Sequence, residues 1–397
     1  MTQTHFDVII IGAGPAGLGL ARTLADTPLN IAIIDGLDGE TLANPSEDGR
    51  DIALTHTSEQ IMQDLGMWAH IPDDQCGLIR DAKVINGKSD YALHFDASGK
   101  GSDYLGRIVP NYLIRRAAYT VVKDQENLTM MPETRVTGVK TDAQSGQVTL
   151  DDGTILTAAL IVAADSRFSA SRRMMGLSAN SLDFGRVVIV CEMAHDLPHN
   201  NTATECFHYD QTLAILPMNG LKSSVVVTLP TDAADRAMAM PEQEFSDDIA
   251  ARFGGSLGAM RLTTKRHPYP LVAVLARQFV TTRFALVGDA AVGMHPVTAH
   301  GYNLGLSGAG LLANEVRAAA ARGDDIGALH GLKRYEAAHK RAVLPLYHGT
   351  NALVRLYTDN TVPGRILRGA ALRLGNVLAP VKNRILHQLT HIDERAR

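Results

Sequence analysis

Cysteine is scarce in this chain of 397 residues, which contains only Cys76, Cys191 and Cys206. The three lie far apart, and none belongs to a C-x-x-C pair. This number and spacing argue against a disulfide framework and against a thiolate metal site. An H-E-x-x-H motif is missing as well. We therefore predict three buried or neutral thiols in a reducing cytosol, and no bound metal.

Long hydrophobic runs are also missing. No stretch approaches the roughly 18 apolar residues of a membrane-spanning helix. Residues 1–4 lead directly into a predicted strand, without the charged and apolar regions of a secretory signal. Hydrophobic residues make up 45% of the chain and charged residues 20%, which is the composition of a globular protein. We expect about two or three domains and a cytoplasmic location.

Charge of one sign does not dominate, because the formal net charge is −4. Residues 331–397 differ: they contain 12 Lys and Arg against 4 Asp and Glu, whereas the rest of the chain contains 26 against 38. Such a basic tail could be drawn to the anionic surface of the inner membrane, or it could be a helical face that complements the acidic body. The acidic body and the lack of a recognised motif argue against nucleic acid as a partner.

The N-terminal residues have the pattern of a dinucleotide-binding βαβ unit. A strand is predicted at residues 6–11, a Gly-Ala-Gly-Pro-Ala-Gly turn follows at 12–17, a helix at 18–26, and a second strand at 31–34 that ends at Asp35. The first glycine of such a turn permits the tight bend, the second lets backbone approach a pyrophosphate, and the third lets helix and strand pack closely. Asp35 is placed to bind ribose hydroxyls, so we predict a dinucleotide site.

A second nucleotide element lies far downstream. Residues 284–287 form an unbroken apolar run, typical of a strand buried on both faces, and Gly288 and Asp289 follow at its carboxyl end. A helical pattern begins after Gly301. Taken alone, this stretch could be an ordinary βα turn. Ligands of open α/β sheets nevertheless bind beside such strand ends and helix starts. Together the two elements favour FAD over NAD.

These motifs resemble those of the flavoprotein aromatic hydroxylases of the para-hydroxybenzoate hydroxylase type, and within them the ubiquinone-biosynthesis hydroxylases (UbiH/UbiF/UbiM family). Residues 12–17 resemble the ADP-binding fingerprint, and residues 49–55 (GRDIALT) the segment that places an arginine near the flavin. Residues 160–167 (LIVAADSR) resemble the second motif, and residues 286–306 resemble G-D-A-A-H-x-x-x-P followed by G-Q-G-x-N. Residues 51–57 (DIALTHT) favour the UbiM-like branch.

The chain departs from the family motifs at four positions. Ser166 stands for the usual glycine of the second motif, and Val292 for the histidine of the third, although His295 is close by. His300 stands for the usual glutamine, and Ser307 for an acidic residue. The aspartates, the proline and the remaining helix-start residues match, which preserves the prediction of FAD binding. The departures bear on the substrate and on the reductant.

The resemblance implies an FAD-dependent monooxygenase that uses O₂ and NAD(P)H or another reductant. Through a flavin C4a-hydroperoxide it would hydroxylate a polyprenylated phenol or benzoquinol of ubiquinone biosynthesis, such as 5-demethoxyubiquinol, with membrane contact and a Ubi-type assembly as further expected partners. The implied catalytic residues are His295, Pro296 and His300. The implied cofactor-binding residues are Gly12, Gly14, Ala16, Gly17, Asp35, Arg50, Arg115, Asp165, Gly288, Asp289, Gly301, Tyr302 and Asn303.

Residues 81–109 and 186–229 alternate short apolar runs with polar breaks. We expect them to form one mainly antiparallel sheet over the flavin, completed near residues 261–267. The predicted fold is therefore α/β: a Rossmann-like FAD-binding domain, an inserted, mainly antiparallel β-sheet substrate domain and a helical C-terminal tail. The predicted segments are 1–75, 106–180 and 270–325 for the FAD-binding domain, 76–105 and 181–269 for the substrate domain, and 326–397 for the C-terminal region, with helices at 329–356, 365–378 and 381–389.

Other functions stay open at this point. One is an FAD hydroxylase of a small soluble aromatic compound, and another is a non-catalytic FAD-binding subunit of a biosynthetic complex. NADPH oxidation coupled to hydroxylation of a substrate would distinguish an enzyme from a subunit. A halogenase is disfavoured, because its tryptophan-containing signature is missing and the one tryptophan is Trp68.

Overall fold

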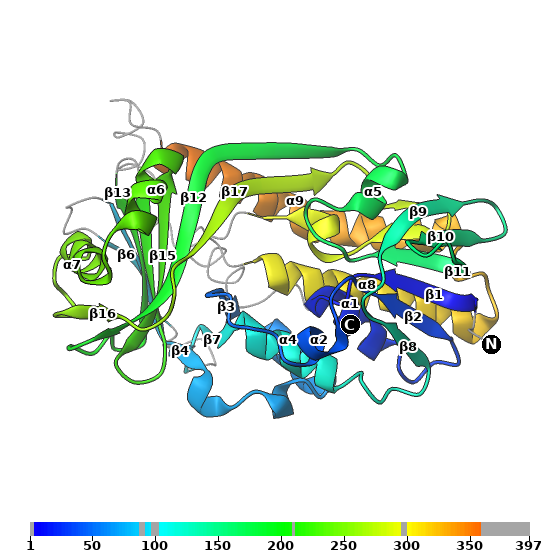
Figure 1. Ribbon diagram of the computed structural model, residues 1–397, viewed down its shortest axis with the longest axis horizontal. Helices are drawn as coiled ribbons and strands as arrows, with labels where there is room; N and C mark the ends of the chain where they lie inside the picture. The colour runs from blue at the N-terminus through cyan, green and yellow to red at the C-terminus, as the bar shows by residue number, and fades with distance from the viewer. Residues whose placement is uncertain (1–3, 87–91, 97–102, 209–210, 295–299, 359–397) are drawn as a thin grey trace.

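The structure, a computed structural model, describes residues 4–86, 92–96, 103–208, 211–294 and 300–358. Two lobes lie along the long axis of the molecule (Figure 1). One lobe contains a largely parallel sheet with helices against it, and the other contains a large, mainly antiparallel sheet.

The sheet of the first lobe has the strand order β18-β19-β11-β1-β2-β8. Its parallel strands are β1 (His5–Ile11), β2 (Ile31–Ile34), β8 (Leu128–Met131), β11 (Ile155–Ala163) and β19 (Phe284–Leu286). Antiparallel additions are β18 (Val280–Thr281) on β19, and β10 (Gly146–Leu150) with β9 (Val136–Thr141) beside β11. Every residue of β2 and β19 is buried, because both faces of the sheet are covered, as the unbroken apolar run at residues 284–287 predicted for β19.

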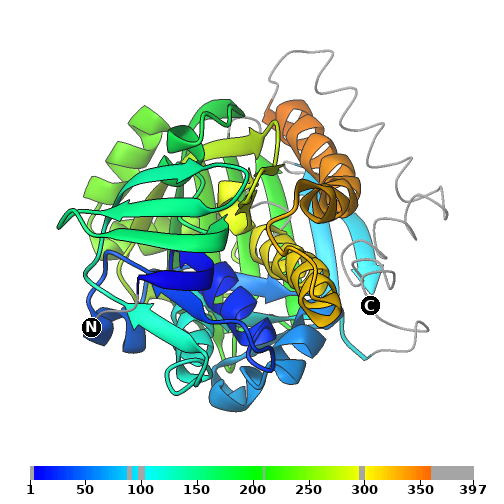
Figure 2. The ribbon, with the colours of Figure 1, turned by 90° about the vertical axis from the view of Figure 1, so that its right-hand side faces the viewer.

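Helices cover this sheet. α1 (Pro15–Thr23) packs against α8 (Gly301–Arg322), and α8 packs against α9 (Leu329–Thr358), so that α8 and α9 lie side by side in Figure 2. α1 begins three residues earlier than predicted, because proline is well tolerated in the first turn of a helix. The other helices are α2 (Gly39–Ala43), α3 (His56–Asp64), α4 (Asn111–Thr120), α5 (Ala170–Met174), α6 (Thr231–Ala239) and α7 (Glu242–Arg252), with short 3₁₀ turns at Trp68–His70, Asp73–Gln75 and Gly288–Ala290.

The helices predicted at 365–378 and 381–389 lie outside the described residues. Among the helices that are described, none is both long enough and apolar enough to cross a membrane.

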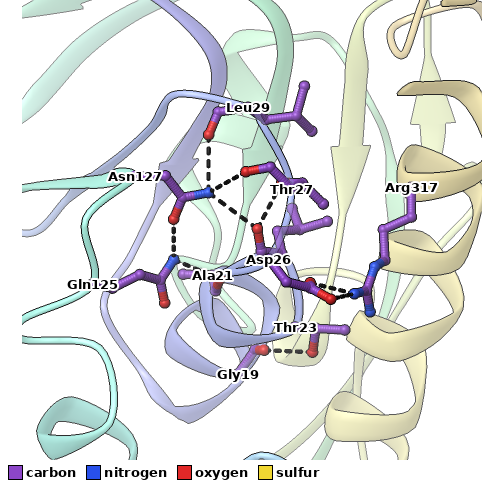
Figure 3. Close-up of polar contacts among 10 residues, drawn as sticks. Gly19, Ala21, Thr23, Asp26, Thr27, Leu29, Gln125, Asn127 and Arg317 are labelled. Carbon is purple, nitrogen blue, oxygen red and sulfur yellow. Dashed lines mark hydrogen bonds and ion pairs between the residues drawn. The ribbon is translucent and has the colours of Figure 1, made fainter. Parts of the chain in front are cut away.

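Side-chain hydrogen bonds hold the turn that connects α1 to β2 (Figure 3). Asn127 Nδ2 lies 3.0 to 3.1 Å from the carbonyl oxygens of Leu24, Thr27 and Leu29. At the end of α1, Asp26 forms an ion pair with Arg317 of α8. These contacts fix the position of α1, and therefore that of the glycine-rich turn at its start.

The second lobe is built on a sheet with the strand order β20-β17-β12-β15-β14-β13-β5-β6. Its strands are β5 (Asp81–Asn86), β6 (Ala92–Asp96), β12 (Ala179–His195), β13 (Thr202–His208), β14 (Gln211–Pro217), β15 (Lys222–Pro230), β17 (His267–Ala276) and β20 (Val292–Gly293), with β16 (Met260–Leu262) beside β12. All of these strands pair antiparallel except β13 and β5, which are parallel. The mainly antiparallel sheet predicted from residues 186–229 is thus present.

Two long strands connect the lobes. β12 extends over 17 residues and pairs with β17, with a shift in register between Asp183 and Val187. In Figure 1 both strands run from the first lobe into the second. The same pair of strands therefore belongs to the sheet of one lobe and reaches over the other.

One predicted sheet assignment was wrong. Residues 106–109 were expected in the large antiparallel sheet, but β7 (Gly106–Pro110) pairs with β3 (Asp51–Leu54) and β4 (Gly77–Ile79) in a separate three-stranded sheet. An alternating strand pattern reports which face is buried, but not which strand is the neighbour.

Candidate active site

A cavity of about 500 Å³ lies between the two lobes, which is within the size range of small-molecule sites. Its walls come from segments far apart in the sequence. From the first lobe they are Gly12, Gly14, Pro15, Ala16, Asp35, Ala164, Asp165, Ser166, Arg167, Gly288, Asp289, Met294, Gly301, Tyr302 and Gly305. From the three-stranded sheet and its surroundings they are Arg50, Asp51, Ile52 and Asn111, and from the large sheet Val190, Glu205, Thr212, Ala214, Leu216, Val226 and Thr228.

The glycine-rich turn before α1 has no room for side chains at two of its glycines. Gly12 has φ +109°, and a Cβ there would lie 2.5 Å from the Ala164 carbonyl oxygen. At Gly17 a Cβ would lie 2.1 Å from the Gly12 carbonyl oxygen. Gly14 differs, since a Cβ there would meet no described atom within 4 Å and the residue faces the cavity. Gly12 and Gly17 therefore shape the turn, and Gly14 keeps its surface open to a ligand.

Asp35 stands at the carboxyl end of β2, where it was predicted. One of its carboxylate oxygens, Oδ2, accepts a hydrogen bond from the Ala13 N–H at 2.7 Å, and the other, Oδ1, accepts one from the Leu37 N–H at 2.9 Å. These bonds orient the carboxylate at the cavity wall, beside the turn. A ribose with two hydroxyl donors suits this acceptor.

The second motif places Asp165, Ser166 and Arg167 at the end of β11. Asp165 Oδ2 accepts a hydrogen bond from the Ser171 N–H at 3.1 Å, while its buried Oδ1 accepts none from the described residues. Ser166 has φ 134°, a conformation that favours glycine. The serine that replaces the family glycine has thus kept the backbone conformation of a glycine.

Arg167 connects the second motif to the third. Its Nη2 donates to Asp289 Oδ2 at 3.1 Å, and its Nη1 donates to the Val272 carbonyl oxygen at 3.1 Å. Gly288, with φ +59°, approaches the first motif so closely that a Cβ there would lie 2.9 Å from Ala16 Cβ. The three motifs therefore form one continuous wall. The sequence prediction did not include Arg167, although it directly follows the Asp-Ser pair of the second motif.

The start of α8 supplies a further part of the wall. Gly301, Tyr302 and Gly305 line the cavity. Asn303 is buried behind them, where its Oδ1 accepts from the Thr55 N–H at 3.2 Å and its Nδ2 donates to the Ala53 carbonyl oxygen at 2.9 Å. Asn303 therefore attaches α8 to β3 and does not itself line the cavity.

Arg50 also lines the cavity, where its position is fixed by Asp48 and Tyr269. Its Nε and Nη2 donate to Asp48 Oδ2 at 3.0 and 2.5 Å, and its guanidinium lies 5.6 Å from the centre of the Tyr269 ring. Tyr269 Oη donates in turn to the Asp48 carbonyl oxygen at 2.7 Å. Burial lowers the pKa of Arg50, but its hydrogen bonds and ion pair with Asp48 more than offset this and raise the pKa above its usual value. Arg50 is therefore a fixed cation.

Two carboxyl groups that the sequence prediction did not include also line the cavity. Burial raises the pKa of Asp51 to about 7, and the neighbouring carboxylates of Glu192, Asp48 and Glu47 add to the shift. Burial raises the pKa of Glu205 to about 8. Asp51 lies inside the quoted GRDIALT segment, so its position was visible in the sequence. For Glu205 no sequence signal existed, because its exposure to the cavity depends on the pairing of β13.

Several predicted site residues do not line the cavity. Gly17 lies behind the turn, Arg115 is on α4, and His300 is buried at the N-terminus of α8. His295 and Pro296 lie outside the described residues. All three cysteines are buried, as predicted, and burial raises the pKa of Cys76 to about 11 and those of Cys191 and Cys206 to about 12.

The residues present fit FAD. The turn that leads into α1 combines an open glycine with a helix start that has no acidic residue in its first turn, which suits a pyrophosphate. Asp35 suits one ribose, and Asp289 of the third motif also lines the cavity. The unpaired Asp165 Oδ1 is a further buried acceptor at the same wall. No metal cluster of His, Cys, Asp or Glu occurs among the described residues.

Comparisons with known proteins agree with this geometry. The family model "FAD binding domain" matches residues 5–343. The chain is 47% identical over 390 residues to the ubiquinone hydroxylase UbiM of Neisseria meningitidis, covering 97% of this chain and 85% of that protein. It is 35% identical over 373 residues to the ubiquinone hydroxylase UbiL of Rhodospirillum rubrum, covering 93% of this chain and 86% of that protein.

Solved structures share the fold. The p-nitrophenol 4-monooxygenase PnpA of Pseudomonas putida superposes with a TM-score of 0.79 at 18% identity, covering 99% of this chain and 100% of that chain. PqsL of Pseudomonas aeruginosa also superposes with a TM-score of 0.79, at 20% identity, covering 93% of this chain and 99% of that chain. The predicted fold class is thereby confirmed.

Proposed function

The chain belongs to the FAD binding domain family, and from this premise we propose that it hydroxylates a prenylated phenol or benzoquinol of ubiquinone biosynthesis. Its relatives at 47% and 35% identity carry the name ubiquinone hydroxylase, which supports this reaction. The family match bears out the predicted cofactor, FAD, and the ubiquinone hydroxylase relatives bear out the predicted enzyme class, a flavoprotein monooxygenase. An aromatic small molecule, O₂ and a reductant are the corresponding reactants.

One observation carries the proposal: a single cavity joins the three nucleotide motifs to the large sheet. The first-lobe wall is rich in glycines and carboxylates, whereas the large-sheet wall is mostly apolar. A dinucleotide fits against the first wall. An aromatic ring with an apolar chain fits against Val190, Ala214, Leu216 and Val226 of the second, because burial of apolar surface favours it there.

Bound FAD supplies the activation of O₂ and the transfer of one oxygen atom to the ring. The chain binds, orients and shields the reactants. The turn at Gly14 would receive the pyrophosphate, Asp35 a ribose, and Asp289 the ribityl hydroxyls. N–H groups at the start of α8 would stabilise negative charge at the pyrimidine edge, by about 0.3–2 kcal/mol from the helix dipole. The wall of the large sheet would exclude water from the reacting ring.

We propose that His295, Pro296 and His300 contribute to catalysis, and that His300 does so from behind the cavity wall, because it is buried at the N-terminus of α8. We also propose that residues 1–75, 106–180 and 270–325 form the FAD-binding domain, and that residues 76–105 and 181–269 form the substrate domain. The course of β12 through both lobes means that the boundary near residue 180 falls at the start of a continuous strand.

The decisive experiment uses the purified holoprotein with a short-chain prenylated benzoquinol that lacks one ring oxygen, together with NADH or NADPH and O₂. The expected product is heavier by one oxygen atom, and ¹⁸O₂ should supply that atom. Parallel reactions with 4-hydroxybenzoate test a small soluble acid as the substrate. Reductant oxidation without any hydroxylated product from either compound would contradict the proposal.

We further propose that the basic C-terminal segment brings the enzyme to an anionic membrane surface, where prenylated substrates reside. The support is the excess of basic over acidic residues in residues 331–397. Flotation with vesicles that contain anionic lipid, compared between the full chain and a chain that ends at Pro363, tests this. Equal binding by the two chains would contradict it.

A further inference from the structure

Glu205 is the charged residue that the large sheet places in the cavity wall. The other residues of this sheet that line the cavity are apolar or carry a hydroxyl: Val190, Thr212, Ala214, Leu216, Val226 and Thr228. None of the described lining residues from this sheet is a cation. Burial of a carboxyl group in such a wall without a hydrogen-bond partner is energetically unfavourable, so we expect this group to have a function.

The register of the strands fixes the direction in which this side chain points. Glu205 on β13 pairs with Ala214 on β14 on one side and with Val84 on β5 on the other. Paired residues project to the same face of a sheet, and Ala214 lines the cavity. Ala203 and Phe207 lie two positions before and after Glu205 on β13, so they are on the same face of the sheet, and both pack in an apolar cluster there. Slippage by one residue would turn Glu205 away from the cavity.

The two carboxyl oxygens of Glu205 differ in their partners. Thr212, which also lines the cavity, forms a side-chain hydrogen bond with the carboxyl group. Oε1 is buried and accepts no hydrogen bond from any described residue. Buried polar atoms of native proteins almost always have a partner. A ligand in the cavity that offers a hydrogen-bond donor would supply it.

The charges around the cavity restrict the ligand. The cations among the described residues that line the cavity are Arg50 and Arg167. Arg50 is paired with Asp48, and Arg167 is paired with Asp289. The remaining charged lining residues, Asp35, Asp51 and Asp165, are acidic. A ring that carried a carboxylate would thus meet further carboxylates and no unpaired described cation. A phenolic hydroxyl is uncharged and is a hydrogen-bond donor.

We infer that Glu205 is a catalytic residue that receives the hydroxyl proton of an uncharged phenolic substrate through Oε1. The inference rests on the proposed function and specifies the class of its substrate. The phenolic O–H bond breaks, the proton moves to Oε1, and the electron pair stays on the ring oxygen. The extra electron density at the ring carbons favours their hydroxylation by the proposed O₂-dependent reaction. The proton returns to the ring oxygen of the product, which restores the carboxylate.

The inference predicts a particular pH dependence. Burial raises the pKa of Glu205 to about 8, the hydrogen bond from Thr212 acts in the opposite direction, and the charged groups on the other walls of the cavity are not among the causes. The proton-accepting form is the carboxylate. In the wild-type enzyme, kcat/KM should therefore rise with pH up to about 8 and then level off.

The test compares wild-type holoenzyme with E205Q, E205D and a matched control, E192Q. Glu192 is a half-buried carboxyl of the same sheet that does not line the cavity. E205Q should lower kcat/KM for the prenylated benzoquinol by about 100-fold or more and abolish its rise with pH. E205D should recover part of the activity and the rise with pH. E192Q should behave like wild type, and the flavin content should be equal in all four proteins.

The inference is overturned if E205Q keeps the wild-type kcat/KM and pH profile while wild type hydroxylates the phenol. That result would leave the proposed function intact. If wild type hydroxylates no phenol, the proposed function fails. The role of Glu205 is then tested by comparing how tightly wild type and E205Q bind a phenol. A phenol that perturbs the flavin spectrum should bind at least 10-fold more weakly to E205Q than to wild type, and equal dissociation constants would overturn the inference.

Discussion

Ser166 has a backbone conformation that residues with a side chain rarely adopt, with φ 134°. Such a conformation costs about 1–3 kcal/mol for a residue other than glycine. Hydrogen bonds of the two neighbouring residues hold Ser166 in this conformation, because Asp165 accepts from the Ser171 N–H and Arg167 donates to Asp289. The departure from the family glycine is therefore a substitution that the surrounding motif tolerates at a cost in stability.

We predict that Ser166→Gly increases the free energy of unfolding by about 1 kcal/mol. The relief of strain exceeds the extra backbone entropy of glycine in the unfolded chain, which is about 0.5–1 kcal/mol. Urea unfolding in saturating FAD measures the change. Ser166→Ala is the control and should gain nothing, since alanine keeps the strain. A glycine variant less stable than wild type would refute the strain argument.

Asp289 gives a second prediction at the residue scale. It accepts a hydrogen bond from Arg167 and faces the cavity from the third motif. Hydrogen bonds to a charged group contribute about 1.5–3 kcal/mol, so Asp289→Ala should weaken FAD binding by about 10- to 100-fold. Fluorescence titration of the apoprotein with FAD measures this, and Asp289→Asn should lose less. A purified alanine variant with full flavin occupancy would contradict the assignment.

At the scale of elements, the glycines around α1 have two different roles: Gly17 is needed for the packing of the helix, and Gly14 for the binding of the ligand. A Cβ on Gly17 would come within 2.1 Å of the Gly12 carbonyl oxygen, whereas a Cβ on Gly14 would meet no described atom within 4 Å. Gly17→Ala must therefore displace α1, which also contacts α8 and α4. Gly14→Ala changes only the surface that faces the cavity.

We predict that Gly17→Ala lowers the free energy of unfolding of the FAD-free protein by about 1–3 kcal/mol, as overpacking typically does. Gly14→Ala should leave that free energy within about 0.5 kcal/mol of wild type. Both variants should bind FAD more weakly. Thermal unfolding with and without FAD distinguishes the two effects. Equal stability losses in the absence of FAD would show that the turn is not packed as described.

The elements also show what a sequence can predict. The two strands of the βαβ unit were predicted to within one residue and its helix to within three, because glycine spacing, an apolar run and Asp35 are local signals. The assignment of β7 was wrong, since pairing with β3 and β4 joins segments that sequence periodicity does not relate. Glu205 was missed for the same reason: its access to the cavity follows from its register with Ala214. Arg167, by contrast, is the last residue of the second motif quoted above, so its position was visible in the sequence.

At the scale of the whole molecule, the buried titratable groups give stability a pH dependence. The pKa of Asp51 is raised to about 7 and that of Glu205 to about 8, so the native state binds more protons than the unfolded state above their ordinary pKa values. Stability should fall as pH rises through this window. Burial lowers the pKa of His339 to about 4, which has the opposite effect as pH falls below about 6.5.

We therefore predict that the free energy of unfolding decreases between about pH 6.5 and 8, where His339 no longer contributes to the slope. The double variant D51N/E205Q should flatten this decrease. Urea unfolding at pH 6.5, 7.5 and 8.5 in saturating FAD measures both slopes. A wild-type stability that rises across this range would contradict the protonated state of the two carboxyl groups.

The cavity draws its walls from residues as far apart in the sequence as Gly12 and Gly305. During synthesis, the glycine-rich turn leaves the ribosome long before β19 and α8 exist. At about 5–20 residues per second, roughly 15 to 60 s separate the two events. Once β11 has been synthesised, its apolar edge stays exposed until its neighbour β19 follows. FAD can therefore stabilise the growing chain only after residues 284–305 have been synthesised.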